Sequence, residues 1–324
     1  MRNIMYGQAI CEAQGEEMER DHDVLLLGLD VEKMGGAFGQ TTGLYDKFGP
    51  ERVVNMPISE SGYTGAGVGL AMMGKRPIVE LQFADFGAYA FDSIANQAAK
   101  TRYMSGGQWT VAMVIRACQG AGFGAGAQHS QCIESWFQNV PGLKIVVPST
   151  AADAKGLLKT AIRDNDPVLY LEHKALLGIK GDVPEGDFMV PFGQATIARE
   201  GKDITIVAYQ LMFYRSLEAA QVLDKEGISV EIIDPRTLVP LDRDTIAKSV
   251  RKTGRGLVVH EHPTRGGFGG EISALINEDC FGMLKAPVRR LGAVNAPLPF
   301  GMAEVHNLPS VEAIVKAVKE IVKK

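Results

Sequence analysis

The sequence predicts an α/β protein of two domains, the first of which holds a parallel sheet with helices on both faces. The chain has 324 residues, which at roughly 150 residues a domain suggests two domains. Short, near-continuous apolar runs alternate with helical segments, as in parallel sheets that are covered on both faces. A stretch rich in glycine, proline and charge interrupts this alternation over 176–202, which favours a linker. We therefore expect domains at 1–180 and 203–324, joined by a linker at 181–202.

The first domain is expected to contain buried parallel strands. Its predicted strands are the apolar runs Val24–Gly28, Pro77–Phe83, Trp109–Arg116, Lys144–Val147 and Val168–Glu172. Apolar or small residues at three-to-four spacing predict helices between them, and helical patterning is already present by Tyr6. The longer helical segments are Ser61–Met73, Phe91–Met104 and Ala151–Arg163.

The same alternation restarts in the second domain and predicts another α/β unit. Its predicted strands are Asp203–Tyr209, Val230–Asp234, Gly256–Glu261 and Val288–Leu291. Its predicted helices are Phe213–Glu226, Asp242–Thr253, Gly270–Asn277 and Ser310–Val322. The sequence contains no short internal repeat.

The composition argues against a nucleic-acid-binding or membrane protein. The formal net charge is −4 and there is no basic run, so nucleic acid and anionic membranes are poor partners. No stretch of about 18 apolar residues is available to span a membrane. The four cysteines form no CxxC pair and no Cys/His cluster, which favours reduced thiols over disulfides or structural zinc. Because the start of the chain does not resemble a targeting signal, we expect a cytoplasmic protein.

Three glycine clusters, at Gly62–Gly74, Gly120–Gly126 and Gly266–Gly270, suggest a nucleotide site at first sight. A dinucleotide fingerprint needs G-x-G-x-x-G directly after a strand, with an acid about 20 residues further on. Gly65-Ala66-Gly67-Val68-Gly69 has another spacing and lies within a run of small helical residues. We therefore expect these glycines to let two helices pack closely. The P-loop pattern is absent, and a nicotinamide site stays only as an alternative.

Glu60 lies where an extended segment turns into the glycine-rich helix. One interpretation is a helix N-terminal charge, worth well under about 1 kcal/mol. The neighbours of Glu60 are small and apolar, however, and offer no sequence-local cation. A carboxylate in such surroundings has its pKa raised and can share a proton with a basic ring nitrogen. The residues alone leave both interpretations open.

Polar and aromatic residues also follow two predicted strands. His129 comes after the glycine-rich loop behind the strand Trp109–Arg116, and a second group follows the strand Pro77–Phe83. This second group consists of Gln82, Phe83, Asp85 and Phe86. Open α/β sheets bind ligands at the carboxyl ends of their strands, and a near-neutral pKa suits histidine to proton transfer. Ordinary structural packing is the alternative for each of these residues.

His260-Glu261-His262 resembles a metal-binding trio. On a strand, however, the two histidines share one face while the glutamate points to the other. The pattern is therefore a weak indication of zinc.

Nine motifs run in order along the chain. They are Pro57–Gly62 (PISESG), Gln82–Phe86 (QFADF), Asn96–Tyr103 (NQAAKTRY), Ala127–Gln131 (AQHSQ), Pro141–Lys144 (PGLK), Asp153–Leu158 (DAKGLL), Ala161–Asp164 (AIRD), Glu231–Leu238 (EIIDPRTL) and Lys252–Arg255 (KTGR). Together they resemble the β subunit of the thiamine-diphosphate-dependent 2-oxo acid dehydrogenases, a group that includes the pyruvate, branched-chain and acetoin enzymes. The resemblance covers essentially the whole chain.

This resemblance implies a transketolase-like fold, with a pyrimidine-binding domain at 1–180 and a transketolase C-terminal α/β domain at 203–324. Thiamine diphosphate would bind between two different subunits and serve as the electron sink for decarboxylation. Glu60 matches the glutamate that hydrogen-bonds the aminopyrimidine ring and promotes deprotonation of the thiazolium carbon. His129 matches the histidine proposed to handle protons as the acyl group passes to a lipoyl arm.

Other site residues follow from the same resemblance. The cofactor-wall positions are Ile58, Ser59, Gln82 and Phe86, of which Phe86 matches an aromatic that packs on the pyrimidine ring. The expected substrate contacts are Phe83, Ala84, Asp85, Phe86 and His129. A potassium site built largely from backbone carbonyls, present in some members, matches Met113, Ala161, Ile162, Asp164 and Asp166.

One motif of the related fold is missing from this chain. Related proteins hold Mg²⁺ and the diphosphate with a Gly-Asp-Gly…Asn motif, and the chain contains no Gly-Asp-Gly. The resemblance therefore implies an α subunit that supplies most of these contacts in an α2β2 heterotetramer. It also implies docking on a dihydrolipoyl acyltransferase core, with a 2-oxo acid or acetoin as the small-molecule substrate.

The chain departs from the family pattern at three places, one of which is the glycine-heavy stretch Arg265–Gly270. Leu29 stands in Gly28-Leu29-Asp30-Val31, where the family usually places an acid linked to cofactor contact and proton traffic. Tyr209-Gln210-Leu211 replaces the usual Tyr-Gly step. The leading hypothesis is a catalytic β subunit that oxidatively decarboxylates a 2-oxo acid or cleaves acetoin. The alternatives are a non-catalytic β-like subunit, with Leu29 as a sign of decay, and a nicotinamide-dependent oxidoreductase.

Overall fold

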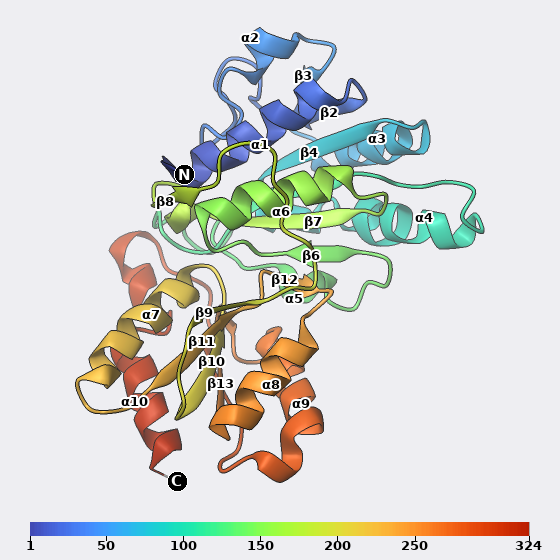
Figure 1. Ribbon diagram of the computed structural model, residues 1–324. Helices are drawn as coiled ribbons and strands as arrows, with labels where there is room; N and C mark the ends of the chain where they lie inside the picture. Colours follow the sequence, from blue (N-terminus) through green and yellow to red (C-terminus); the bar gives the residue numbers. More distant parts are fainter. Residues whose placement is uncertain (324) are drawn as a thin grey trace. The chain divides into compact units, whose positions relative to one another are not determined.

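The computed structural model describes residues 1–323 and divides into two compact units (Figure 1). The first unit comprises Met1–Gln119 and Trp136–Phe192. The second comprises Gly120–Ser135 and the chain from Gly193 onwards. The loop that contains His129 thus belongs with the second unit, although strand β5 (Val114–Gln119) of the first unit leads into it.

The main sheet of the first unit is parallel, as predicted. Its strands lie in the order β6-β7-β5-β4-β2-β3, and every neighbouring pair runs parallel. The bounds are β2 (Val24–Gly28), β3 (Val53–Asn55), β4 (Arg76–Phe83), β5 (Val114–Gln119), β6 (Lys144–Val146) and β7 (Val168–His173). β5 starts later than the expected Trp109, because the Met113 amide donates to the Val111 carbonyl within its own segment.

Helices lie on both faces of this sheet. In Figure 1, α1 and α6 run side by side in front of the sheet and α3 and α4 lie behind it. The bounds are α1 (Tyr6–Arg20), α2 (Leu44–Phe48), α3 (Glu60–Met72), α4 (Ala99–Met104), α5 (Glu134–Phe137) and α6 (Ala151–Arg163). The helix expected over Phe91–Met104 is a π-helical segment, Ser93–Ala98, followed by α4. A small antiparallel sheet, β1 (Arg2–Met5) with β8 (Lys180–Val183), was not predicted.

The second unit contains a sheet in the order β14-β13-β10-β11-β9. All of its pairs are parallel except β9 with β11. The strand bounds are β9 (Thr196–Arg199), β10 (Ile204–Ala208), β11 (Val230–Asp234), β13 (Gly256–Pro263) and β14 (Arg289–Ala293), and β12 (Thr237–Val239) is a further short strand. β9 lies in the stretch expected to be a linker.

Four helices cover the second sheet. They are α7 (Leu211–Asp224), α8 (Arg243–Thr253), α9 (Gly269–Cys280) and α10 (Val311–Val322). α7 packs against α10, and α8 packs against α9. α8 and α10 start one residue later than predicted because Asp242 and Ser310 are N-caps, whose side chains accept from the Thr245 and Ala313 amides.

Gln210 in the second unit has a strained backbone. Its φ of 53° lies in the left-handed region that glycine adopts readily and other residues adopt at a cost. Glycine, the usual residue at this position in the family that the chain resembles, adopts this conformation readily. Glutamine in place of glycine at this position therefore costs conformational free energy and adds no group to the proposed site.

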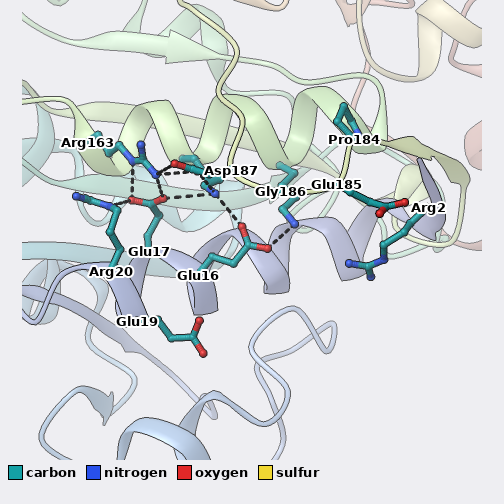
Figure 2. A pocket seen from close by; sticks show the side chains of 12 residues that line it. Arg2, Glu16, Glu17, Glu19, Arg20, Arg163, Pro184, Glu185, Gly186 and Asp187 are labelled. Carbon is teal, nitrogen blue, oxygen red and sulfur yellow. Dashed lines mark hydrogen bonds and ion pairs between the residues drawn. The ribbon is translucent and has the colours of Figure 1, made fainter.

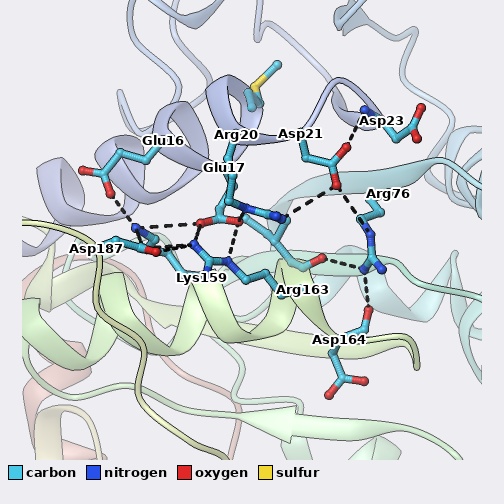
Figure 3. A network of polar contacts seen from close by, with 12 residues as sticks. Glu16, Glu17, Arg20, Asp21, Asp23, Arg76, Lys159, Arg163, Asp164 and Asp187 are labelled. Carbon is cyan, nitrogen blue, oxygen red and sulfur yellow. Dashed lines mark hydrogen bonds and ion pairs between the residues drawn. The ribbon is translucent and has the colours of Figure 1, made fainter.

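An ion-pair network joins α1 to α6 in the first unit (Figure 3). Arg163 Nη2 lies 2.7 Å from Glu17 Oε1 and 2.9 Å from Asp187 Oδ1. Lys159 Nζ lies 2.8 Å from Glu16 Oε2. A cavity of about 530 Å³ beside this network is lined mainly by the same charged side chains (Figure 2). Because these charges are paired with one another, we interpret the cavity as structural.

Glu17→Gln is expected to lower the free energy of unfolding by about 2–3 kcal/mol at pH 7. The Glu17 side chain is fully buried, and the substitution removes its charge-assisted bonds to Arg163 and Arg20. Although burial opposes ionisation, these bonds hold the pKa of Glu17 below its ordinary value of 4.5. The stabilisation is thus present above pH 4.5 and is lost as the pH falls through the folded-state pKa.

Urea unfolding of the wild type and of Glu17→Gln, measured between pH 7 and pH 3, checks this prediction. The half-exposed Glu19, which pairs with Lys47, provides the control Glu19→Gln, for which a change within about 0.5 kcal/mol is expected. Equal stabilities of wild type and Glu17→Gln at pH 7 would contradict the assignment.

Candidate functional site

The candidate site lies at the carboxyl edge of the first sheet. β2 pairs in parallel with both β3 and β4, so the segments that follow these three strands emerge at one edge. The Met56 amide donates to the Gly28 carbonyl at 2.8 Å, and Gln82 Nε2 contacts the Leu29 carbonyl at 3.5 Å. The structure therefore brings the segment before Glu60, the segment after β4 and Leu29 to the same edge.

Glu60 is the first residue of α3, one residue before the predicted helix start at Ser61. Ser59 precedes it as the N-cap residue without a side-chain capping bond, and Ile58 before that is 78% exposed. Glu60 itself is only partly buried in this single chain. Its carboxylate has the favourable position of an anion at a helix N-terminus. Burial, together with the nearby charge of Glu60, raises the pKa of the Tyr63 hydroxyl.

Three phenylalanine rings form a cluster at this edge. The Phe83 ring lies 5.3 Å from the Phe38 ring and 5.7 Å from the Phe86 ring, both edge to face. Ala84 and Asp85 are buried in the short 3₁₀ helix Ala84–Ala88 that carries Phe86. Phe38 was missed by the sequence reasoning, although its loop, Gly35-Gly36-Ala37-Phe38-Gly39, follows β2 closely. The cluster offers aromatic, apolar surface at this edge, against which another ring can pack.

A buried polar cluster lies beneath the Phe38 loop. Arg116 on β5 bonds Glu80 on β4 and contacts Glu172 on β7 at 2.9 Å, while Gln40 donates to Glu172 from the loop. Burial raises the pKa of Glu172. A Cβ on Gly36 would lie 2.6 Å from the Glu80 carboxylate, so only glycine allows the loop to sit so close. The cluster thus fixes the loop that carries Phe38.

Four of the five residues matched to a potassium site, Ala161, Ile162, Asp164 and Asp166, lie in the last turn of α6 or just after it. The fifth, Met113, precedes β5, and its carbonyl accepts from the Val168 amide at 3.0 Å. Arg76 Nη1 donates to the carbonyls of Ile162 at 3.0 Å and Asp164 at 2.9 Å. Lys144 Nζ pairs with the carboxylates of Asp164 at 2.7 Å and Asp166 at 3.0 Å. The chain's own cations therefore already contact several of these oxygens.

His129 lies in the second unit and is partly buried. Its amide contacts the Gly126 carbonyl at 3.4 Å, so it stands directly behind the turn of the glycine-rich loop. Glu60 and Phe86, in contrast, belong to the first unit.

The remaining glycine clusters have structural explanations. A Cβ on Gly67 would lie 2.7 Å from Val79 of β4, so this glycine lets α3 approach the sheet. A Cβ on Gly65 would lie 3.5 Å from Ser93 in the π-helical segment that packs against α3, as expected for a contact between two helices. A Cβ on Gly269 would lie 2.6 Å from Nε2 of His260, so the Gly266–Gly270 cluster encloses that ring. Burial lowers the pKa of His260 to about 4, as expected for a histidine kept neutral in the core.

Two kinds of feature are absent from residues 1–323. Within this range, no group of three or more His, Cys, Asp and Glu side chains is arranged to hold a metal ion. Across the same residues, no helix has the length and apolar character needed to cross a membrane.

Two family models match the chain. Transketolase, pyrimidine binding domain, matches residues 2–180, and Transketolase, C-terminal domain, matches residues 193–314. Both names agree with the fold class expected from the resemblance.

Three curated relatives are similar to nearly the whole chain. The acetoin:2,6-dichlorophenolindophenol oxidoreductase subunit beta of Cupriavidus necator is 48% identical, covering 99% of this chain and 98% of that protein. The 2-oxoisovalerate dehydrogenase subunit beta of Bacillus subtilis is 48% identical, covering 92% of this chain and 91% of that protein. The mitochondrial pyruvate dehydrogenase E1 component subunit beta-2 of Oryza sativa subsp. japonica is 47% identical, covering 96% and 84%.

Solved structures agree with these relatives. A split gene transketolase, described as an inactive beta4 tetramer, matches with a TM-score of 0.80 at 29% identity, covering 99% of this chain and 98% of that chain. Transketolase from Leishmania mexicana matches with a TM-score of 0.75 at 16% identity, covering 100% of this chain and 46% of that chain, which supports the fold alone. The chain therefore belongs to the family of β subunits of the pyruvate, branched-chain 2-oxo acid and acetoin dehydrogenases, built from the transketolase pyrimidine-binding and C-terminal domains.

Proposed function

We propose that this chain is the catalytic β subunit of a heteromeric thiamine-diphosphate enzyme. The enzyme oxidatively decarboxylates pyruvate or a branched-chain 2-oxo acid, or cleaves acetoin, and passes the acyl group to a lipoyl acyltransferase. The observation that carries the proposal is the placement of Glu60 at the first turn of α3, at the same sheet edge as Gln82 and Phe86. Relatives named for each of these substrates support it.

The residues present fit the pyrimidine end of the cofactor. Glu60 offers a carboxylate at a helix N-terminus, where it can hold and return a proton to a ring nitrogen. Phe86 and the exposed Ile58 offer apolar contact on the same edge, and the Gln82 side chain offers an amide. When bound, thiamine diphosphate supplies a nucleophilic carbon and an electron sink. Glu60 would then set the protonation of the pyrimidine, and His129 would handle protons during acyl transfer.

The partner subunit is needed to complete this site. Glu60 is only partly buried and Ile58 is 78% exposed in the single chain, whereas the proposed chemistry needs a carboxylate kept from water. Other large apolar side chains of the first unit are also exposed, among them Tyr89 at 71% and Tyr103 at 90%, which is typical of surfaces that another protein covers. An α subunit would cover them in an α2β2 assembly and bring the Mg²⁺ and diphosphate contacts.

Cofactor binding with and without the partner tests this proposal. The tagged chain is purified from its host with whatever co-elutes, and thiamine diphosphate is titrated in the presence of Mg²⁺ by calorimetry. We expect saturable binding to the complex and at least about tenfold weaker binding to the chain alone, because the single chain lacks the diphosphate contacts. Equally tight binding to the chain alone would contradict the shared site.

We also propose a potassium ion at the C-terminal end of α6. The last carbonyls of a helix and its negative dipole end favour a cation, and the carboxylates of Asp164 and Asp166 lie nearby. Arg76 already donates to two of the carbonyls and opposes a second cation. We expect K⁺ to raise the melting temperature of the complex by about 2–4 °C over Na⁺ at equal ionic strength. Identical melting temperatures in the two salts would reject the site.

The remaining proposals concern location and assembly. All four cysteines are free thiols, which supports a reducing compartment such as the cytoplasm. Docking on a dihydrolipoyl acyltransferase core follows from the proposed acyl transfer.

A further inference from the structure

The glycine-rich loop before His129 is held by two carboxylates that come from distant parts of the second unit. Oε1 of Glu261, on β13, accepts from the Ala121 amide at 2.6 Å. Oε1 of Glu304, in the 3₁₀ helix Gly301–His306, accepts from the Gly122 amide at 2.9 Å. Both glutamates are buried, at 7% and 6% exposure. Two consecutive backbone amides of the loop are thus held by hydrogen bonds to buried carboxylates, and such charge-assisted bonds are among the stronger ones in proteins.

The segment in front of Glu304 clamps the next part of the loop. The Gly301 amide donates to the Gly124 carbonyl at 3.0 Å. The Phe300 ring lies so close to Gly126 that a Cβ there would be 2.6 Å from it. Gly124 and Gly126 also have φ of +63° and +79°, which other residues rarely adopt. Residues 300–304 therefore support the conformation of the loop through direct contacts with Gly122, Gly124 and Gly126.

A third contact fixes the far end of the loop. The Tyr209 hydroxyl donates to Glu134 Oε1 at 2.8 Å, and both residues are buried. Burial, with the charge of Glu134, raises the pKa of Tyr209, so the hydroxyl keeps its proton. The Gly120 amide contacts the Gln131 carbonyl at 3.3 Å and closes the loop around His129. His129 thus lies in a loop whose two ends are both held by hydrogen bonds.

We infer that Glu261 and Glu304 are positioning residues that set the loop of His129 for acyl transfer. The inference rests on the proposed function, because it needs His129 to act in that step. Neither glutamate is assigned a contact with substrate or cofactor; each acts on the loop backbone. Loss of either charge weakens a charge-assisted hydrogen bond to the loop, and a shift of about 1 Å in a reacting group can cost about 100-fold in rate. The step before it, decarboxylation, relies on Glu60 in the other unit and should be largely spared.

The test compares two half-reactions in the holoenzyme that is purified with its co-eluting subunit. Reduction of an artificial dye acceptor reports decarboxylation, and acylation of free lipoamide reports acyl transfer. Glu304→Gln and Glu261→Gln are expected to slow lipoamide acylation by about 10–100-fold while dye reduction stays within about twofold. Glu312→Gln, an exposed acid at the start of α10, is the matched control and should change neither rate.

Several results would overturn the inference. If the glutamine variants slow both half-reactions in equal proportion, or slow neither, then the two glutamates have no positioning role. A wild-type complex that turns over no substrate rejects the proposed function itself, so the two failures are distinguishable. A measurement that needs no variant also applies: hydrogen exchange at the Ala121 and Gly122 amides of the wild-type complex should be slow. Exchange as fast as that of exposed loop amides would show that the two glutamates do not hold the loop.

Discussion

Glu60→Gln is expected to lower thiamine-diphosphate-dependent turnover of the complex by at least about 100-fold. The amide keeps the size of the side chain but cannot take up or return a proton. The fold should remain intact, because Glu60 is partly exposed at the start of α3 and the lost helix-dipole interaction is worth about 1 kcal/mol or less. Initial rates of dye reduction, with urea unfolding of the same preparation, measure both effects.

The control for Glu60→Gln is Glu51→Gln. Glu51 is an exposed acid in the segment before β3, and its substitution should leave turnover unchanged. Normal turnover in Glu60→Gln would remove the proposed mechanism. A fall in turnover that follows a loss of unfolding free energy would assign Glu60 a structural role instead.

His129→Ala is expected to separate the two half-reactions. Dye reduction should partly survive, since decarboxylation is assigned to Glu60 and the cofactor, whereas lipoamide acylation should fall by about 100-fold or more through loss of a proton-transfer group. Single-turnover assays with dye and with lipoamide measure the two rates on one preparation. His22→Ala, at an exposed position, should alter neither rate. An equal loss of both half-reactions would refute this division of roles.

The elements predicted from the sequence are those whose hydrophobic pattern is strong and local. β2, α6 and β11 match their predicted bounds residue for residue, because a continuous apolar run or an amphipathic stripe needs no distant partner to be recognised. β1, β8 and β9 were missed because they are short, partly exposed strands, which carry no such pattern. Gly65 faces a helical segment, as expected, whereas Gly67 faces strand β4, because a glycine shows that something approaches but not whether it is a helix or a strand.

The candidate site was predictable only in part. The position of Glu60 at the start of a helix followed from the turn in the hydrophobic pattern, whereas its degree of burial depends on a partner that the sequence does not contain. Glu261 and Glu304 were missed as loop anchors because they lie 140 and 182 positions away from the amides that they bind. Phe38 was missed because a single aromatic in a glycine-rich loop gives no indication of the ring it will contact.

The most direct test of the central claim is thiamine-diphosphate-dependent dye reduction by the complex of this chain and its co-eluting subunit. The substrates are pyruvate, branched-chain 2-oxo acids, 2-oxoglutarate and acetoin. We predict turnover of pyruvate, a branched-chain 2-oxo acid or acetoin, lost when either the cofactor or the second subunit is left out. If none of the four substrates is turned over while the cofactor is shown to be bound, the result would contradict a catalytic β subunit. It would favour a non-catalytic one, with Leu29 as the first residue to examine.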